Sequence, residues 1–311
     1  MKRLFWRDRR EETFSPGVRI LVTGYRILGR RAGDFITWWV IAAYWLFNRR
    51  ARRISRDYLD RVERFAEKSG KGRLRLNTLS HFERFGHAIA ERILAWSGVM
   101  TRSEADYRDG AFERLAELSR EGKSVLLLSS HLGNTEILRA FNTRKLRVAV
   151  NVLMDSRNSR KMAEIIRSTN AESAVHVVEA DDEDAVMSAF LGDSISNGEW
   201  FAMMADRLTS EKSRRTVRAE LLGEAVTLPA SPWIVASAFR LPVFLLHAVR
   251  SGKSYSVYLR EIGPVSPDRK CRAAEAERCA QIYCRELERL ILEAPYDWFN
   301  FYDFWRDDAG D

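Results

Sequence analysis

Short, continuous apolar runs separated by helical segments are the feature that most constrains how this chain can fold. The first is Val125–Leu128, and similar runs follow at residues 147–153, 174–178, 200–204 and 243–249. Runs of this length without polar alternation are typical of strands buried on both faces, as in parallel sheets. Strands that alternate with helices predict an α/β fold with a mostly parallel central sheet flanked by helices.

The segments outside this pattern are predicted to be helical, apart from one further strand. Residues 58–118 carry long charged runs and few β-branched residues, as amphipathic helices do. Residues 255–261 are a strand candidate, and residues 268–293 are expected to form a long closing helix. In such folds the chemistry lies in loops just beyond the carboxyl ends of the strands, so functional residues are expected there.

The N-terminal quarter holds the basic character of the chain. The net charge of the 311 residues is +8, from 51 Lys and Arg against 43 Asp and Glu. Residues 1–75 contain 20 basic and 8 acidic side chains, a net of +12, which leaves 31 against 35, or −4, for the remainder. A basic segment of this kind indicates an anionic partner.

Within this quarter, residues 35–47 form an apolar, tryptophan-rich run of 13 residues that is followed by arginines. A spanning helix needs roughly 20 apolar residues, so we expect an interfacial or partly inserted helix attracted to an anionic membrane surface. Residues 1–57 are therefore predicted to be a membrane-association segment with helical anchoring character, and residues 58–311 the α/β domain. The alternative is a buried core helix. Nucleic-acid binding is disfavoured because the aromatic residues are not interleaved with basic ones.

The start of the chain and its three cysteines indicate in which cellular compartment the protein is expected. The basic start has no apolar stretch directly after it, so we expect no cleaved signal peptide and a chain on the cytoplasmic side. The three cysteines, at positions 271, 279 and 284, form no C-x-x-C pair and are interpreted as reduced structural thiols. No metal and no other cofactor is predicted.

The most informative loop follows the first strand and contains His131 and Glu136. A His-x4-acid pair is common by chance, and a second one, His176 with Asp181, is interpreted as an ordinary strand residue beside an acidic helix start. His131 differs because it lies at a strand end, next to Gly133 and before an expected helix N-terminus. This context suits deprotonation of a hydroxyl by His131, with Glu136 fixing its tautomer. A structural strand-end histidine is the alternative.

The segment His131–Glu136, HLGNTE, resembles the H-x-G-N-x-E box of the bacterial lipid A biosynthesis acyltransferases, the lauroyl and related late enzymes of the glycerolipid acyltransferase superfamily. Two later segments are similar in the same order. Residues 200–207 resemble the strand of that family that ends in an arginine, and residues 222–232 resemble its G-x5-P-x-x-P segment. The resemblance covers roughly residues 15–295.

The resemblance implies transfer of a fatty acyl chain from an acyl carrier protein to a hydroxyl of a membrane glycolipid. His131 would be the catalytic base and Glu136 its partner. The substrate-binding residues expected from the same boxes are Arg207, which would bind phosphate, and Asp206, Asn134 and Gly133. An ion pair of Arg207 with Asp206 or Glu211 is the alternative. The implied location is the bacterial inner membrane, with the catalytic domain on the cytoplasmic face.

The end of the chain departs from the family pattern. The family usually finishes with a tryptophan and a basic stretch, whereas this chain ends with the aromatic segment 296–305 and an acidic finish. The aromatic ending resembles relatives associated with aryl polyene and other glycolipid pathways, so the acceptor is either a lipid A precursor or a related lipid. A thioesterase or other hydrolase using His131, and a non-catalytic membrane-associated scaffold, are the alternatives in function.

Overall fold

The structure is a computed structural model that divides into two compact units. The helical unit contains Met1–Thr101, Glu220–Val226 and Leu287–Asp311, and the sheet unit contains Arg102–Ala219 and Thr227–Glu286. The residues that the structure describes are 33–96, 105–107, 111–134, 148–154, 175–179, 185–208, 215–252, 254–263, 265–268 and 270–305.

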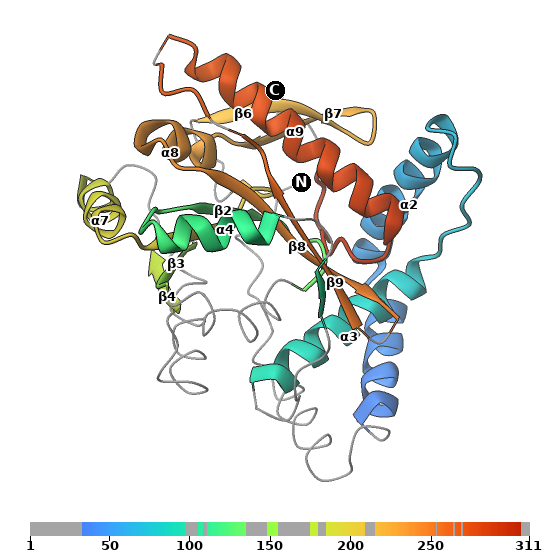
Figure 1. Ribbon diagram of the computed structural model, residues 1–311. Helices are drawn as coiled ribbons and strands as arrows, with labels where there is room; N and C mark the ends of the chain where they lie inside the picture. The colour runs from blue at the N-terminus through green and yellow to red at the C-terminus, as the bar shows by residue number, and fades with distance from the viewer. Residues whose placement is uncertain are drawn as a thin grey trace. The chain divides into compact units, whose positions relative to one another are not determined.

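The sheet unit is built on a seven-stranded sheet with the strand order β1-β9-β8-β2-β5-β3-β4 (Figure 1). Neighbouring strands run parallel at every pairing except that of β8 with β9. The prediction of an α/β fold with a mostly parallel central sheet is therefore confirmed. The strands are β1 (Ala105–Tyr107), β2 (Leu126–Ser129), β3 (Val150–Met154), β4 (Val175–Glu179), β5 (Trp200–Met204), β8 (Val243–Ser251) and β9 (Ser254–Glu261).

Helices cover the sheet because its central strands carry apolar side chains on both faces. On one face, Leu115 and Leu118 of α4 (Ala111–Arg120) pack in one core cluster with Leu127 of β2. In other parts of the unit, Trp233 of α8 (Ser231–Phe239) meets Tyr283 of α9 (Arg272–Glu293) edge to face. The Tyr283 hydroxyl donates to the carbonyl oxygen of Ser129 at 3.0 Å. This bond fixes the end of β2, where the candidate site begins.

Four elements differ from the sequence prediction. Strand β1 lies inside the stretch 58–118 that was expected to be helical, because three residues carry no recognisable apolar run. Strands β6 (Thr216–Leu221) and β7 (Glu224–Pro229) form a separate two-stranded sheet. The burial pattern of β6 alternates, unlike the continuous runs of the central strands. Helix α9 begins at Arg272, four residues later than predicted.

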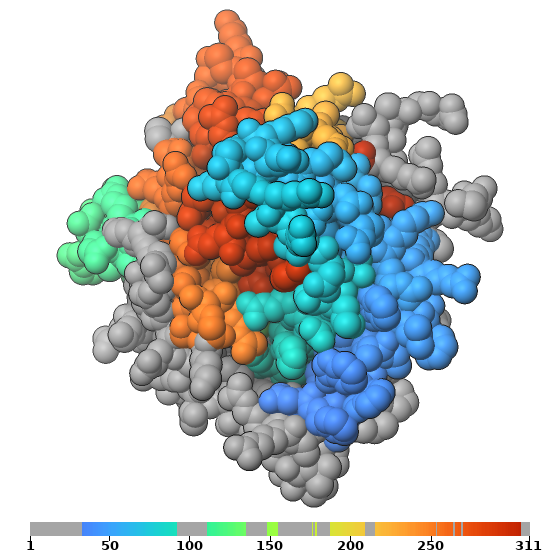
Figure 2. Space-filling view, turned by 90° about the vertical axis from the view of Figure 1, so that its right-hand side faces the viewer, coloured from blue at the N-terminus to red at the C-terminus, as the bar shows by residue number. Residues whose placement is uncertain are grey.

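Consecutive helices near the N-terminus form much of the described part of the helical unit. Residues 33–47 are helical and are followed by α2 (Arg49–Lys68) and α3 (Thr78–Trp96). The indole N–H of Trp45 donates to Thr78 Oγ1 at 3.0 Å, and Ile41 packs with Phe82 in a buried cluster. Figure 2 shows the blue helices at the N-terminus lying beside the cyan α3.

The aromatic segment at the C-terminal end is folded into the core of the helical unit. Trp298 is completely buried, and its carbonyl oxygen accepts a hydrogen bond from His81 Nε2 at 3.0 Å. The other ring nitrogen, Nδ1, therefore accepts from the Ser55 hydroxyl at 2.8 Å. The Tyr58 hydroxyl donates to the carbonyl of Pro295 at 2.8 Å. These contacts hold the start of the aromatic segment in the core of the helical unit.

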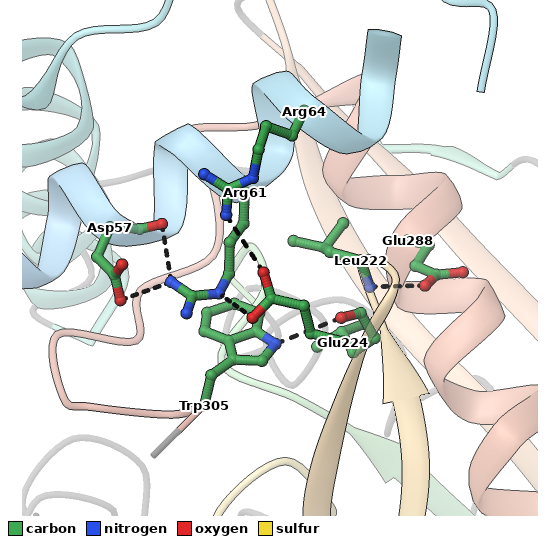
Figure 3. A network of polar contacts seen from close by, with 8 residues as sticks. Asp57, Arg61, Arg64, Leu222, Glu224, Glu288 and Trp305 are labelled. Atoms are coloured by element: carbon green, nitrogen blue, oxygen red, sulfur yellow. Dashed lines mark hydrogen bonds and ion pairs between the residues drawn. The ribbon is translucent and has the colours of Figure 1, made fainter. Parts of the chain in front are cut away.

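The turn between β6 and β7 is also held within the helical unit (Figure 3). Leu222 and Gly223 both have positive φ, 55° and 77°, as a two-residue type I′ turn requires. The Leu222 N–H donates to Glu288 at 2.7 Å. Arg61 of α2 donates to Glu224 at 2.9 Å while its guanidinium lies 4.6 Å from the ring centre of Trp305. The turn, α2 and the C-terminal tail are thus joined by one polar network.

The helix formed by residues 33–47 leaves most of its apolar surface uncovered. Within the described part of the chain, no helix combines the length and apolar character that crossing a bilayer requires. The exposed large hydrophobic side chains of the described residues all belong to this helix: Phe35, Trp38, Trp39, Val40, Tyr44, Leu46 and Phe47.

Candidate active site

The candidate site lies at the carboxyl edge of the central sheet, where β2 and β5 end side by side. Ser129, the last residue of β2, pairs with Met204, the last residue of β5. The Ala205 N–H donates to the carbonyl oxygen of Ser129 at 3.0 Å, so the two chains remain joined just beyond the strands. The segment 130–134 follows β2 at this edge, as the position of the sequence motif predicts.

His131 contacts Asp206, which follows β5. The backbone N–H of His131 donates to Asp206 Oδ2 at 2.9 Å, and the ring Nδ1 lies 2.8 Å from Asp206 Oδ1. One carboxylate therefore binds the backbone and the side chain of the same histidine. About a quarter of the His131 side chain, 27%, is exposed, whereas the Asp206 side chain is completely buried.

The Asp206 carboxylate is held in its charged form. Burial by itself would raise its pKa, but the opposing charge and hydrogen bonds of His131, together with the charge of Arg207, hold the pKa of Asp206 well below its usual range. Arg207 is half-buried directly after Asp206. The site thus pairs a buried carboxylate with a lowered pKa with an imidazole that is partly exposed to solvent.

The other flank of the segment 130–134 is fastened to β8. Gly133 forms a bridge with Ala248, and the Asn134 N–H donates to the Ala248 carbonyl oxygen at 2.8 Å. Gly133 has a φ of +76°, and a Cβ at this position would overlap that carbonyl oxygen. Only glycine permits this close approach, so Gly133 brings the segment onto β8.

A second histidine lies beneath the same segment. His247 of β8 is buried, and its Nε2 lies 3.0 Å from the Ser130 hydroxyl, which also accepts from the Leu132 N–H at 3.1 Å. The contact has the geometry of a nucleophile with its base, but both residues are about 1% exposed, so no substrate reaches the hydroxyl in this arrangement. The pair fixes the backbone on which His131 is carried.

The structure brings together most, but not all, of the predicted site residues. His131, Gly133, Asn134, Asp206 and Arg207 lie together at the carboxyl edge, with Asn134 completely buried. Glu136, the predicted partner of His131, lies outside the described residues, as does Glu211. His176 is exposed on β4, as expected for an ordinary strand residue.

Sequence reasoning missed two contributions to the site. His247 gave no signal, because a single histidine within an apolar strand is usually a core residue. Asp206 was predicted to bind substrate, and its contact with His131 became visible only through the neighbouring positions of β2 and β5. Within the described ranges, no group of three or more His, Cys, Asp or Glu side chains gathers as metal ligands would.

A mostly parallel α/β sheet with an imidazole and a buried carboxylate at its carboxyl edge is an arrangement suited to proton transfer. The family model of the bacterial lipid A biosynthesis acyltransferases matches residues 17–307, and the chain belongs to that family. The family is one of acyltransferases and is generally membrane-associated in bacteria. No curated protein matches the chain.

Proposed function

We propose that the protein transfers a fatty acyl chain from an acyl carrier protein thioester to a hydroxyl of a membrane glycolipid, with His131 as general base assisted by Glu136. The observation that carries the proposal is the His131 ring at the carboxyl edge of the sheet. Its Nδ1 faces the Asp206 carboxylate, and the ring is partly exposed. The proton of the acceptor hydroxyl is proposed to pass to Nε2, the ring nitrogen that does not face Asp206.

The reaction needs one base and no nucleophilic side chain. Nε2 accepts the proton of the acceptor hydroxyl as its oxygen attacks the thioester carbonyl. The resulting imidazolium is stabilised by the negative charge of Asp206 and returns the proton to the departing thiolate. Arg207, half-buried beside Asp206, is proposed to bind an acceptor phosphate because a guanidinium matches phosphate geometry. Gly133 and Asn134 support the site through their backbone contacts with β8.

The acceptor is proposed to be a lipid A precursor or a related glycolipid of the aryl polyene type of pathway, and the aromatic C-terminal segment is the feature that favours the second. The protein would act at the bacterial inner membrane with its catalytic domain on the cytoplasmic face, where acyl carrier protein is present.

The helix 33–47 is proposed to bind an anionic membrane surface. Its exposed aromatic residues are the types that settle at the level of the lipid headgroups. Arg49 and Arg53, at the start of α2, are exposed and would meet anionic lipid. Arg52 has a different role, because its guanidinium donates to the carbonyl oxygens of Trp45 and Leu46 and caps the helix.

The membrane proposal can be tested by flotation of the full-length protein with vesicles of phosphatidylglycerol and phosphatidylethanolamine. Replacing Trp39 and Phe47 together by Ser should weaken binding at least about tenfold, since each buried aromatic contributes about 1.5–3 kcal/mol. The double variant Arg49→Gln/Arg53→Gln should lose binding to these vesicles, whereas Arg285→Gln, also an exposed arginine, should bind like the wild type. Unchanged binding of both double variants would overturn the assignment of this surface.

The acyl transfer can be tested with purified protein, acyl-loaded carrier protein and glycolipid acceptors, with products identified by mass spectrometry. His131→Ala should lower turnover about 10²- to 10⁴-fold, as expected for loss of a general base. His176→Ala is the matched control and should keep turnover within about twofold. A near-normal rate of His131→Ala would refute the mechanism. Release of free fatty acid in place of acylated lipid would instead identify a hydrolase, and absence of any turnover a scaffold.

A further inference from the structure

We infer that the segment 68–77, which joins α2 to α3, is the surface of the helical unit on which the acyl carrier protein docks. The inference rests on the proposed function, in which that protein delivers the acyl chain, and it names the surface that the donor meets. The cations that form this surface are four exposed side chains: Lys68, Lys71, Arg73 and Arg75.

The charge of this segment is not neutralised by the fold. Its ten residues include four cations and no acid, and the exposed Glu67 just before it leaves a local net charge of +3. No residue that the structure describes forms an ion pair or hydrogen bond with the four basic side chains. By contrast, Arg61 and Arg64 of α2 both bind Glu224, at 2.9 and 3.2 Å. The four cations are therefore available to a partner.

The start of the segment is fixed by the way α2 ends. Gly70 has a φ of +73°, and its N–H donates to the Glu67 carbonyl oxygen at 3.2 Å. The Lys71 N–H donates to the Ala66 carbonyl oxygen at 2.9 Å. These two bonds form a Schellman motif, in which the left-handed residue after the helix is usually glycine. The motif turns the chain back along α2.

The far end of the segment is held by side chains. The Leu76 N–H donates to Glu63 of α2, and the Leu76 carbonyl oxygen accepts from Arg56 at 3.2 Å. The Asn77 N–H donates to the Tyr296 hydroxyl oxygen at 3.2 Å. Figure 1 shows the chain running beside α2 before α3 begins. Because the backbone is fixed at both ends, docking does not have to order it first.

The second half of the segment presents its cations to solvent. Arg73 and Arg75 are exposed, whereas Leu74 and Leu76 are half-buried. In an extended chain every second side chain lies on the same side, so the two arginines share the outer side with Cα atoms roughly 6.6 Å apart. The dipole of α2 favours a cation in the last turn, which accounts for Lys68, but this effect does not reach residues five and seven positions later.

The chemistry of the segment fits an acidic protein better than a lipid surface or nucleic acid. The exposed large hydrophobic side chains of the described residues all belong to the helix 33–47, so this segment offers charge without groups that insert into a bilayer. The 20 residues of α2 span about 30 Å between that helix and this segment. No aromatic residue stands among the cations, as base stacking would require. Acyl carrier proteins are acidic, and fixed, exposed cations complement such a surface.

The first test measures binding of the full-length protein in detergent to acyl carrier protein without an acyl chain, so that no turnover occurs. Affinity should fall about tenfold in Arg73→Gln/Arg75→Gln and about 100-fold in Arg73→Glu/Arg75→Glu, with a weaker salt dependence than in the wild type. The matched control Arg240→Gln/Arg285→Gln removes two exposed arginines of the sheet unit and should bind like the wild type.

The second test uses the acyl-loaded carrier protein. Arg73→Gln/Arg75→Gln should raise KM for this donor about tenfold and keep kcat within about twofold, because the two arginines act in docking and not in the chemical step. KM for the glycolipid acceptor should stay the same. A fall in kcat with an unchanged donor KM would overturn the docking role.

Vesicle flotation distinguishes an acidic protein from lipid as the partner. Arg73→Gln/Arg75→Gln should float with vesicles of phosphatidylglycerol and phosphatidylethanolamine as the wild type does. Lost flotation with unchanged carrier-protein binding would overturn the inference and assign these cations to lipid. Absence of carrier-protein binding by the wild type, or equal binding by Arg73→Glu/Arg75→Glu, would overturn it as well.

The outcomes separate the docking surface from the proposed function. His131→Ala should bind the carrier protein like the wild type although it forms almost no product. If the wild type binds the carrier protein through these cations but transfers no acyl chain, the proposed function is refuted and the docking surface stands. If transfer depends on His131 while Arg73→Glu/Arg75→Glu leaves the donor KM unchanged, the proposed function stands and this inference is refuted.

Discussion

Replacement of Gly133 by Ala tests the way in which the candidate site is held against β8. An Ala side chain would overlap the Ala248 carbonyl oxygen, and its Cβ would lie 2.8 Å from the carbonyl carbon. The backbone must therefore move by more than the few tenths of an ångström that close packing absorbs. That movement breaks the 2.8 Å hydrogen bond between the Asn134 N–H and the Ala248 carbonyl oxygen.

The loss of stability expected for Gly133→Ala has two contributions. A non-glycine residue in the left-handed region costs about 1–2 kcal/mol, and loss of one buried hydrogen bond with its acceptor left unsatisfied costs about 1–3 kcal/mol. We expect Gly133→Ala to lower the free energy of unfolding by about 3 kcal/mol. Turnover should fall about 100-fold or more, because a displacement of about 1 Å in a catalytic group has effects of that order.

Gly122 offers a matched control within the same unit. Its φ is +65°, similar to that of Gly133, but a Cβ there would meet no atom within 4 Å. Gly122→Ala should therefore lower the free energy of unfolding only by the cost of the left-handed conformation, about 1–2 kcal/mol, and should leave turnover unchanged. Urea unfolding followed by circular dichroism, together with the acyl-transfer assay, measures both quantities. Equal losses of stability and activity in the two variants would refute the close approach of residue 133 to β8.

Three further predictions concern other parts of the molecule. Burial lowers the pKa of His81 to about 4, so between pH 6.5 and 4 the unfolded chain binds the proton that the folded protein refuses. Stability should fall by about 3 kcal/mol as the pH drops through that window, and urea unfolding of His81→Gln should lack this loss. Trp305→Ala should lower the midpoint of thermal unfolding by an amount equivalent to about 2–3 kcal/mol, because the half-buried ring contacts Arg61 and donates to the Leu221 carbonyl. Ser130→Ala should lower kcat with little change in KM, since it removes the hydroxyl that joins His247 to the Leu132 N–H. A rise in KM with unchanged kcat would contradict that role.

The sequence was sufficient to predict the central strands because burial on both faces leaves continuous apolar runs. Strand β2 has buried residues at Leu126, Leu127 and Leu128, a pattern that no amphipathic helix of this length gives. Strand β1 has only three residues, and β6 alternates buried and exposed positions, so neither produced such a run. The pairing partner of β1 is β9, about 150 residues further along the chain, whereas β6 pairs with β7 directly after it.

The candidate site was predictable only in part for the same reason. His131 could be placed because it follows β2 directly in the sequence. Its contact with Asp206 depends on β5 lying between β2 and β3 in the sheet, an order that differs from the order along the chain. Sequence proximity pointed to Glu136, whereas the contact with Asp206 joins His131 to a residue 75 positions away in the chain.

The helical unit is assembled from three separate stretches of the chain, which affects when it can fold during synthesis. The bond from His81 to the carbonyl of Trp298 joins residues 217 positions apart, and that from Tyr58 to Pro295 joins residues 237 apart. At translation rates of about 5–20 residues per second, these partners are synthesised roughly 10–45 s after the helices near the N-terminus. Until then the faces of these helices that are buried in the folded protein lack their partners, so a ribosome that stalls before residue 295 leaves the core of the helical unit incomplete.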